Sequence, residues 1–347
     1  MINIRYHIVS ITAVFLALGI GVALGSTFLD RATVDVLDRN IRSAEQGIKE
    51  TNAENDRLNS QLAKSKERDT SLILVGSESL LTDQLKDVPV LAIVAPGVGA
   101  KDLDALSTII ERSGADYRGS VQLSDKLAFA GDVDAGLASD LRLTNPDAAS
   151  LRSAVTNRVT AALLGAGMPL TSSGSSPDPQ ATTTTSTTVP GGSTVVRPEV
   201  PDGTQPAAIT TLIDRGYLKV DPGSSYDDKD PILATTGYRY IYVGGPDLDA
   251  DQNDVLLSLL PATGPVMPAT VISASQAATQ LDEVRDPTVV ARVRANDALE
   301  RRYNTVDNTE TFAGLVATVF TLQGMGDVAP GQYGQADGAT AVLPPPS

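Results

Sequence analysis

The chain lacks cysteine and tryptophan altogether, and its 347 residues include one histidine and four methionines. Without cysteine it can form neither a disulfide framework nor a thiolate metal site. The single histidine, His7, lies beside an apolar N-terminal segment. A Ser-His-Asp triad or a histidine zinc site in the rest of the chain is therefore excluded.

Basic side chains are also scarce, since 27 Lys and Arg stand against 42 Asp and Glu and give a formal net charge of −15. A body this acidic repels nucleic acid phosphates and anionic lipid head groups. We therefore expect no nucleic acid partner.

Only one apolar run is long enough to cross a bilayer. Residues 8–29 carry no charge, and about 20 apolar residues in a helix span a hydrocarbon core of about 30 Å. Residues 1–30 are accordingly predicted to form a membrane anchor that contacts the lipid bilayer, and everything after it lies on one side of the membrane.

The orientation of this anchor follows from the charges that flank it. Arg5 and the N-terminal amine precede the run, so the positive-inside tendency predicts a cytoplasmic N-terminus and an extracytoplasmic body. The alternative is a signal peptide cleaved after Gly25. Signal peptides usually have apolar regions of about 7–15 residues, shorter than this one, which favours an uncleaved single-pass anchor in the cell membrane. Both alternatives export the body.

Residues 31–70 are predicted to form a coiled coil, because branched residues recur at the a and d positions of a heptad that begins at Val34. One asparagine at an a position fixes the register of parallel two-stranded coils. The predicted seam consists of Val34, Leu37, Ile41, Ile48, Asn55, Leu58 and Leu62. It pairs either with a second copy, as a parallel homodimer, or with a heteromeric partner. The alternative is a single amphipathic helix that lies on its own domain.

Small residues in the anchor indicate a second contact between helices. Gly21 and Gly25 form a G-x-x-x-G motif, which lets membrane helices approach closely. On a straight helix, Gly25 and Val34 lie half a turn apart, so one continuous face cannot serve both contacts.

The remaining sequence alternates apolar strand patterns with helical ones, which predicts an α/β domain with a doubly wound, Rossmann-like, mostly parallel sheet. Phe312 to Leu322 is predicted to be a core helix. The predicted halves are 71–167 and 207–334, separated by a disordered Thr/Pro-rich insertion at 168–206 and followed by a disordered tail at 335–347. The predicted strands are 88–95, 116–123, 238–243 and 266–273, and the predicted helices are 101–113, 148–164, 209–215, 251–260 and one that opens at Asp286-Pro287.

No motif in the body specifies a catalytic, cofactor or metal site. Pro96 to Gly99 follows a predicted strand but lacks the spacing and the lysine of a phosphate loop. Asp247, Asp249, Asp251 and Asn253 resemble the start of a calcium loop, but the later glycine and glutamate are missing. We expect these carboxylates to cap a helix at Asp251, and we expect a protein that is not an enzyme.

Several segments together resemble the actinobacterial MctB family: residues 1–26, VLAIVAPG, GADYRGSVQLSD, the segment from YNTVDNTETFAG to VFTL, and PGQYG. The resemblance covers nearly the whole chain outside the insertion. It implies a membrane location and a role in copper homeostasis, usually described as copper export across the envelope.

The residues themselves offer little to bind copper. Copper(I) prefers thiolate or thioether ligands and copper(II) prefers imidazole, whereas this chain has only His7 and four dispersed methionines, Met1, Met168, Met267 and Met325. A single span cannot enclose a pore. We therefore expect copper to be handled through oligomers or partners. The alternative is an envelope scaffold or regulator that docks through the exposed charges of the coiled coil; a related corynebacterial family member is associated with a partner membrane protein in cell separation.

Overall fold

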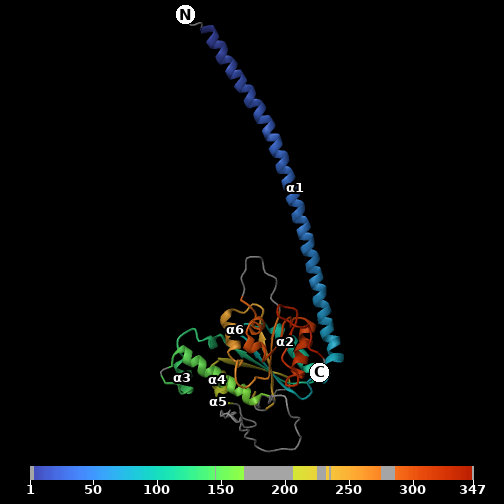
Figure 1. Cartoon of the computed structure of the whole chain (residues 1–347), viewed down its shortest axis with the longest axis vertical. Coiled ribbons are helices and arrows are strands. Elements are labelled where there is room, and N and C mark those ends of the chain that lie inside the picture. The colour runs from blue at the N-terminus through green and yellow to red at the C-terminus, as the bar shows by residue number, and fades with distance from the viewer. Residues whose placement is uncertain are drawn as a thin grey trace, which may run out of the picture. The chain divides into compact units, whose positions relative to one another are not determined.

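The computed structural model describes residues 4–144, 146–167, 206–224, 232–233, 236–274 and 286–345 (Figure 1). The chain divides into two compact units, Met1–Arg68 and Asp69–Ser347. Residues 168–205, which make up nearly all of the predicted insertion, lie outside the described residues. The prediction of a disordered insertion therefore stays a prediction.

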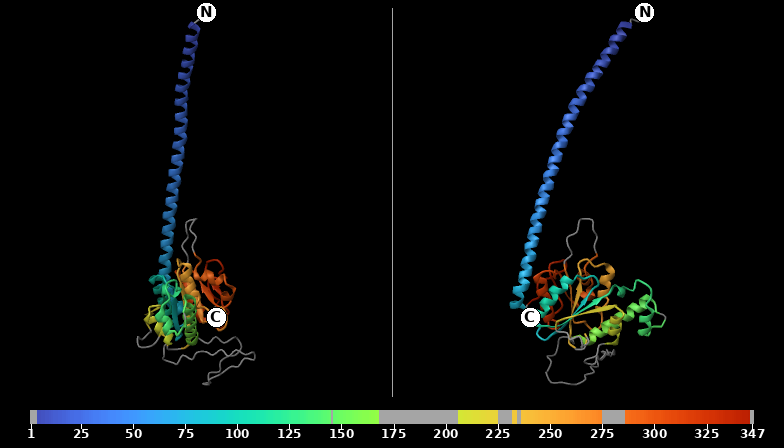
Figure 2. Two further views of the ribbon diagram at one scale, coloured as in Figure 1. Left: turned by 90° about the vertical axis from the view of Figure 1, so that its left-hand side faces the viewer. Right: turned by 180° about the vertical axis from the view of Figure 1, so that it is seen from behind.

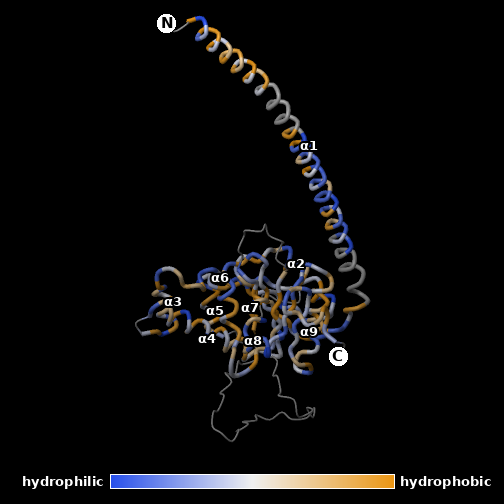
Figure 3. Tube along the Cα trace, turned by 45° about the horizontal axis from the view of Figure 1, so that its top comes forward, coloured by the Kyte–Doolittle hydropathy of each residue, from blue (hydrophilic) through white to orange (hydrophobic). Residues whose placement is uncertain are grey.

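One helix, α1, runs from Ile4 to Leu81. Its first part, Ile4–Gly25, is long and apolar enough to cross a membrane, and Figure 3 shows this apolar stretch giving way to a mainly hydrophilic one. No second helix of this kind occurs among the described residues. The anchor and the predicted coiled-coil segment thus belong to one helix, which extends beyond the predicted boundary at residue 70.

The second unit is built on a seven-stranded sheet with the order β3-β2-β1-β4-β5-β6-β7. All neighbouring strands are parallel except β2 and β3. The strands are β1 Pro89–Val94, β2 Asp116–Leu123, β3 Leu218–Pro222, β4 Arg239–Gly244, β5 Ala269–Ser273, β6 Asn304–Val306 and β7 Gln332–Tyr333. This confirms the predicted α/β class with a mostly parallel sheet.

Helices cover both faces of this sheet (Figure 2). Alternate residues of β1 enter different cores, because Leu91 and Ile93 pack with α3 to α7 whereas Val90 and Val94 pack with α2 and α9. The elements are α2 Ala100–Arg112, η1 Asp125–Ala128, α3 Ala135–Asp140, α4 Ala148–Ala166, α5 Ala207–Asp214, α6 Ala250–Leu257, α7 Val289–Arg294, α8 Asp297–Glu300 and α9 Phe312–Gln323. As predicted, α9 is a core helix, and most of its side chains are buried.

Two predicted helix starts are wrong by a few residues. The N-cap of α6 is Asp249, not Asp251, because the carboxylate of Asp249 accepts from the Gln252 backbone N–H while the Gln252 side chain accepts in return. The N-cap of α7 is Thr288 rather than Asp286. The helix ends at Arg294, and the side chain of Asn296 caps the separate helix α8.

The tail from Gln335 to Ser347, predicted to be disordered, is described as far as Pro345 and makes hydrogen bonds to the rest of the domain. The backbone N–H groups of Gln335 and Ala336 donate to Asp307 at 2.7 and 3.1 Å. Further along, the Gly334 N–H donates to the Ala341 carbonyl at 2.9 Å. The polar, proline-rich composition hid these long-range contacts.

Strand β3 escaped prediction because it is short and its partner lies far away in sequence. It pairs with β2 close to Gly119, which adopts a φ of +108°. A Cβ at Gly119 would overlap the Asp221 carbonyl oxygen and the Gly223 nitrogen. Glycine at this position therefore allows the edge strand to approach β2 closely.

Gly119→Ala is expected to lower the free energy of unfolding by about 2–4 kcal/mol, because the substitution combines backbone strain with overpacking. Gly131→Ala is the matched control, since a Cβ at Gly131 meets nothing within 4 Å. Urea unfolding of the full chain in detergent, followed by near-UV tyrosine signals, measures both. Equal unfolding midpoints for the two variants would contradict the conclusion that Gly119 is required for the close approach of β3 to β2.

Candidate functional sites

Open α/β sheets bind their ligands in the crevice outside the carboxyl ends of the parallel strands, at the point where the strand order reverses. In this sheet that point lies between β1 and β4. A Cβ at Gly97 or Gly245, in the loops after these strands, would lie 3.4 or 3.3 Å from the Leu248 side chain. Leu248 is itself buried. The Leu248 side chain, from the loop after β4, therefore packs against the loops that follow both strands.

Two of the residues that resemble a calcium loop, Asp249 and Asn253, have structural roles. Asp249 caps α6, and the buried Asn253 donates through Nδ2 to the carbonyls of Leu248, Asp249 and Pro287 at 3.1–3.3 Å. These bonds tie the loop after β4 to the segment that precedes α7. Among the described residues, no three His, Cys, Asp or Glu side chains gather where they could hold a metal ion.

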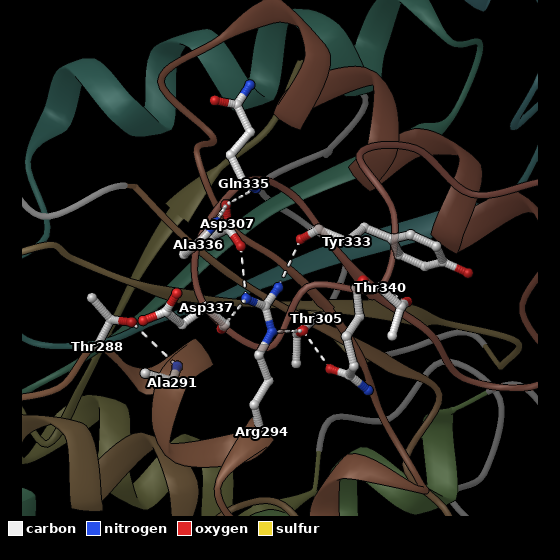
Figure 4. A network of polar contacts seen from close by, with 11 residues as sticks. Thr288, Ala291, Arg294, Thr305, Asp307, Tyr333, Gln335, Ala336, Asp337 and Thr340 are labelled. Atoms are coloured by element: carbon white, nitrogen blue, oxygen red, sulfur yellow. Dashed lines mark hydrogen bonds and ion pairs between the residues drawn. The ribbon is translucent and has the colours of Figure 1, made fainter.

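The best-defined polar cluster lies at the carboxyl end of β6 (Figure 4). Arg294 at the end of α7 donates through Nη1 to Asp307 Oδ2 at 2.7 Å, and both side chains are about 5% exposed. The same guanidinium donates to Thr305 Oγ1 at 2.9 Å and to the Tyr333 carbonyl at 2.7 Å. One arginine thus holds together α7, β6 and β7.

Asp307 completes this cluster from the other side. Its Oδ1 accepts from the N–H groups of Gln335 and Ala336, and a Cβ at Gly334, where φ is +127°, would overlap its carboxylate. Both carboxylate oxygens are therefore satisfied within the protein. The segments TVDN and GQYG, which carry much of the family resemblance, meet here and have a structural role.

A pocket of about 440 Å³ lies beside the end of α9, where Asn304 at the start of β6 and Tyr333 of β7 contribute to its lining. Gln323 Nε2 donates to Gln84 Oε1 at 2.7 Å across its wall. Among the described residues that line it, none is charged, and none provides a thiol, a thioether or an imidazole. The lining residues are Gln84, Asn304, Phe320, Thr321, Gln323, Gly324, Val328, Ala329, Tyr333, Pro344 and Pro345.

An arginine stabilises the helix end beside this pocket. Arg239 Nη1 donates to the carbonyls of Leu322 and Gln323, where the negative end of the α9 dipole lies. Burial lowers the pKa of Arg239, and the charge of Asp327 partly opposes this shift. Arg239 thus acts as a C-terminal cap of α9. The sequence did not predict this role, because Arg239 and the end of α9 are more than 80 residues apart and no local pattern connects them.

The two methionines among the described residues of the α/β unit do not come together. Met267 and Met325 are both buried in different apolar clusters of the sheet, and His7 lies on α1. Met1 and Met168 lie outside the described residues.

The predicted seam residues are exposed along α1. Leu37, Ile41, Ile48, Leu58 and Leu62 are 46–61% exposed. Asn55 is exposed as well, and the side chain of Val34 lies outside the described residues. A Cβ at Gly21 or Gly25 would meet nothing within 4 Å. These positions are therefore open to a membrane or to another chain, and their pairing stays a prediction.

Fold and sites together define a class of protein: an α/β body with a mostly parallel sheet that follows an apolar N-terminal helix fit to cross a membrane. The chain belongs to the MctB family, since the family model described as "Copper transport outer membrane protein, MctB" matches residues 1–344.

Curated relatives carry the same family name. The chain is similar to "Copper transporter MctB" of Mycobacterium tuberculosis strain H37Rv, with 24% identity over 346 residues that cover 99% of both chains. It is also similar to "Copper transporter MctB" of Mycobacterium leprae, with 25% identity over 347 residues that cover 99% of this chain and 100% of the relative. The resemblance recognised in the sequence is thereby confirmed.

Arg294→Met is expected to destabilise the protein by about 3–5 kcal/mol, because it leaves the Asp307 carboxylate buried without its counter-ion. Arg301→Met is the matched control, because Arg301 pairs with Asp297 at 3.2 Å with both side chains more than three-quarters exposed. The control should change stability by less than about 1 kcal/mol. Urea midpoints of the two variants decide the matter, and similar losses would show that the buried pair has no special role.

Proposed function

We propose that this chain is a membrane-anchored, non-enzymatic protein of the cell envelope that contributes to copper homeostasis through a second copy or a partner, without a copper site of its own. The observation that carries the proposal is the combination of family membership along the chain with a lack of copper-type ligand clusters among the described residues. Copper(I) needs sulfur ligands, whereas the pocket near α9 offers amides, hydroxyls and aromatic rings.

The proposed topology is single-pass, with the N-terminus in the cytoplasm and the α/β body outside. The length and hydropathy of Ile4–Gly25 support the anchor. Arg5 and the N-terminal amine support the orientation. In this topology the body can contact other proteins of the envelope, and the only part within the bilayer is one helix, which cannot enclose a pore.

Pairing along α1 is the proposed route to an assembly. The exposed seam residues follow a heptad in which Asn55 occupies an a position, as in parallel two-stranded coils of fixed register. Gly21 and Gly25 permit close approach inside the membrane. One membrane helix cannot enclose a pore for an ion. An assembly, as a homodimer or with a heteromeric partner, brings further membrane helices together and removes this restriction.

A second candidate function is that of a scaffold or regulator of cell separation that works through a partner membrane protein. The exposed surface of α1 supports this alternative as well, because its charged and apolar faces are both accessible. The two functions differ in what the cell loses with the gene: control of copper content in one, and normal septation in the other.

Deletion of the gene should raise whole-cell copper while septa stay normal. Complementation with Ala53→Asp, which places a charge on the outer face of the heptad, should restore copper content. Ile48→Asp places the same charge in the seam and should fail, because a buried unpaired carboxylate disrupts a coiled coil. Copper content is measured by elemental analysis beside septum microscopy.

Normal copper with chained or misdivided cells would refute the transport role and favour the scaffold. Tight stoichiometric copper binding by the purified full chain would refute the absence of a copper site.

Single-cysteine variants test the pairing directly, because the chain has no cysteine of its own. Leu58→Cys lies at a d position and should form an intermolecular disulfide in membranes under mild oxidation, since facing d residues of a parallel pair lie close together. Ala53→Cys lies on the outer face and should remain monomeric on non-reducing gels. If α1 pairs with a heteromeric partner, neither variant should give a homodimer band. Equal cross-linking of the two variants would refute the heptad register that places Leu58 at a d position.

A further inference from the structure

The pocket beside the end of α9 has two prolines of the same chain in its wall, Pro344 and Pro345. We propose that this pocket is a docking site for an extended proline-rich peptide of a partner protein, and that the C-terminal segment of the chain partly occupies it. The proposal is independent of the role in copper homeostasis. The volume of the pocket, about 440 Å³, is within the usual range of ligand pockets, about 300–1,000 Å³.

Two aromatic side chains give the pocket the chemistry that proline-rich segments prefer. Phe320 and Tyr333 both line it, and proline-rich helices dock on aromatic-lined grooves in preformed extended conformations. Figure 4 shows the Tyr333 ring pointing away from Arg294, while the Tyr333 carbonyl accepts a hydrogen bond from that guanidinium. The buried Arg294–Asp307 pair therefore holds one aromatic wall in place.

Amide groups supply the polar contacts. Gln84 uses its Oε1 to accept from Gln323, and Asn304 uses its Oδ1 to accept from the Gly331 N–H at 2.9 Å. The side-chain nitrogens of Gln84 and Asn304 make no hydrogen bond to a described residue, so they are available to donate. An extended proline-rich segment presents carbonyl groups that lack internal partners, which matches these donors.

The tail of the chain is attached as an exchangeable segment would be. Ala341 is fixed by backbone hydrogen bonds to Gln332 and Gly334. Beyond it, none of the described residues 342–345 makes a hydrogen bond, and Val342 and Leu343 are 49% and 41% exposed. A segment of the core would bury these side chains. The attachment point of the tail is therefore Ala341, and the residues beyond it can leave the pocket.

The test uses the full chain in detergent and a fluorescent hexapeptide, VLPPPS, which is the sequence of residues 342–347. A chain that ends after Ala341 should bind this probe in anisotropy titrations. The intact chain should bind it about tenfold more weakly, because the tethered tail competes at high effective concentration. A probe with its three prolines replaced by alanine should bind to neither chain.

Val328→Glu in the shortened chain should abolish probe binding, because Val328 lines the pocket and is 41% exposed. Val133→Glu is the matched control, a 37% exposed valine outside the pocket lining, and should leave binding unchanged. The full-length double variant Pro344→Ala and Pro345→Ala should bind the probe more tightly than the intact chain does. It tests competition by the tail without shortening the chain. The proposal would be overturned if neither the chain that ends after Ala341 nor the double-alanine variant bound the probe while both unfolded at the same urea midpoint as the intact chain. It would also be overturned if the alanine probe bound as tightly as VLPPPS.

Discussion

The buried ion pair between Arg294 and Asp307 is the contact on which the last third of the protein depends. Strands β6 and β7 are only three and two residues long, at or below the lower end of the usual strand length, so they form few backbone hydrogen bonds of their own. The guanidinium binds one side chain and one carbonyl from them, and the carboxylate binds the chain that follows β7. The charge-assisted hydrogen bonds of this network therefore add to the few backbone hydrogen bonds that hold these short strands in the sheet.

The parts of the fold that the sequence predicted are those with strong local signals. The apolar run of β1 and the helical spacing of α2 are signals of this kind. Strand β3 and the two short strands escaped because long-range contacts stabilise them. The helix caps were misplaced because neighbouring carboxyl and hydroxyl groups compete for the same N–H groups, and only the folded geometry selects one of them.

The candidate sites were harder to predict than the fold. The pocket draws its walls from segments as distant as Gln84 and Pro345, which no sequence window connects. Leu248 packs against Gly97 and Gly245 although it belongs to a loop whose carboxylates carry the stronger sequence pattern. The motifs TVDN and GQYG did mark an important place, and the structure assigns them a scaffold role rather than a chemical one.

The position of Pro345 has a practical consequence for any laboratory that handles this protein. Only two residues separate an affinity tag or fluorescent reporter fused after Ser347 from Pro345, which lines the pocket. Such a fusion perturbs the same space that a binding partner would enter. Purification handles and imaging labels therefore belong elsewhere in the chain, and interaction screens with C-terminal fusions undercount partners that use this face.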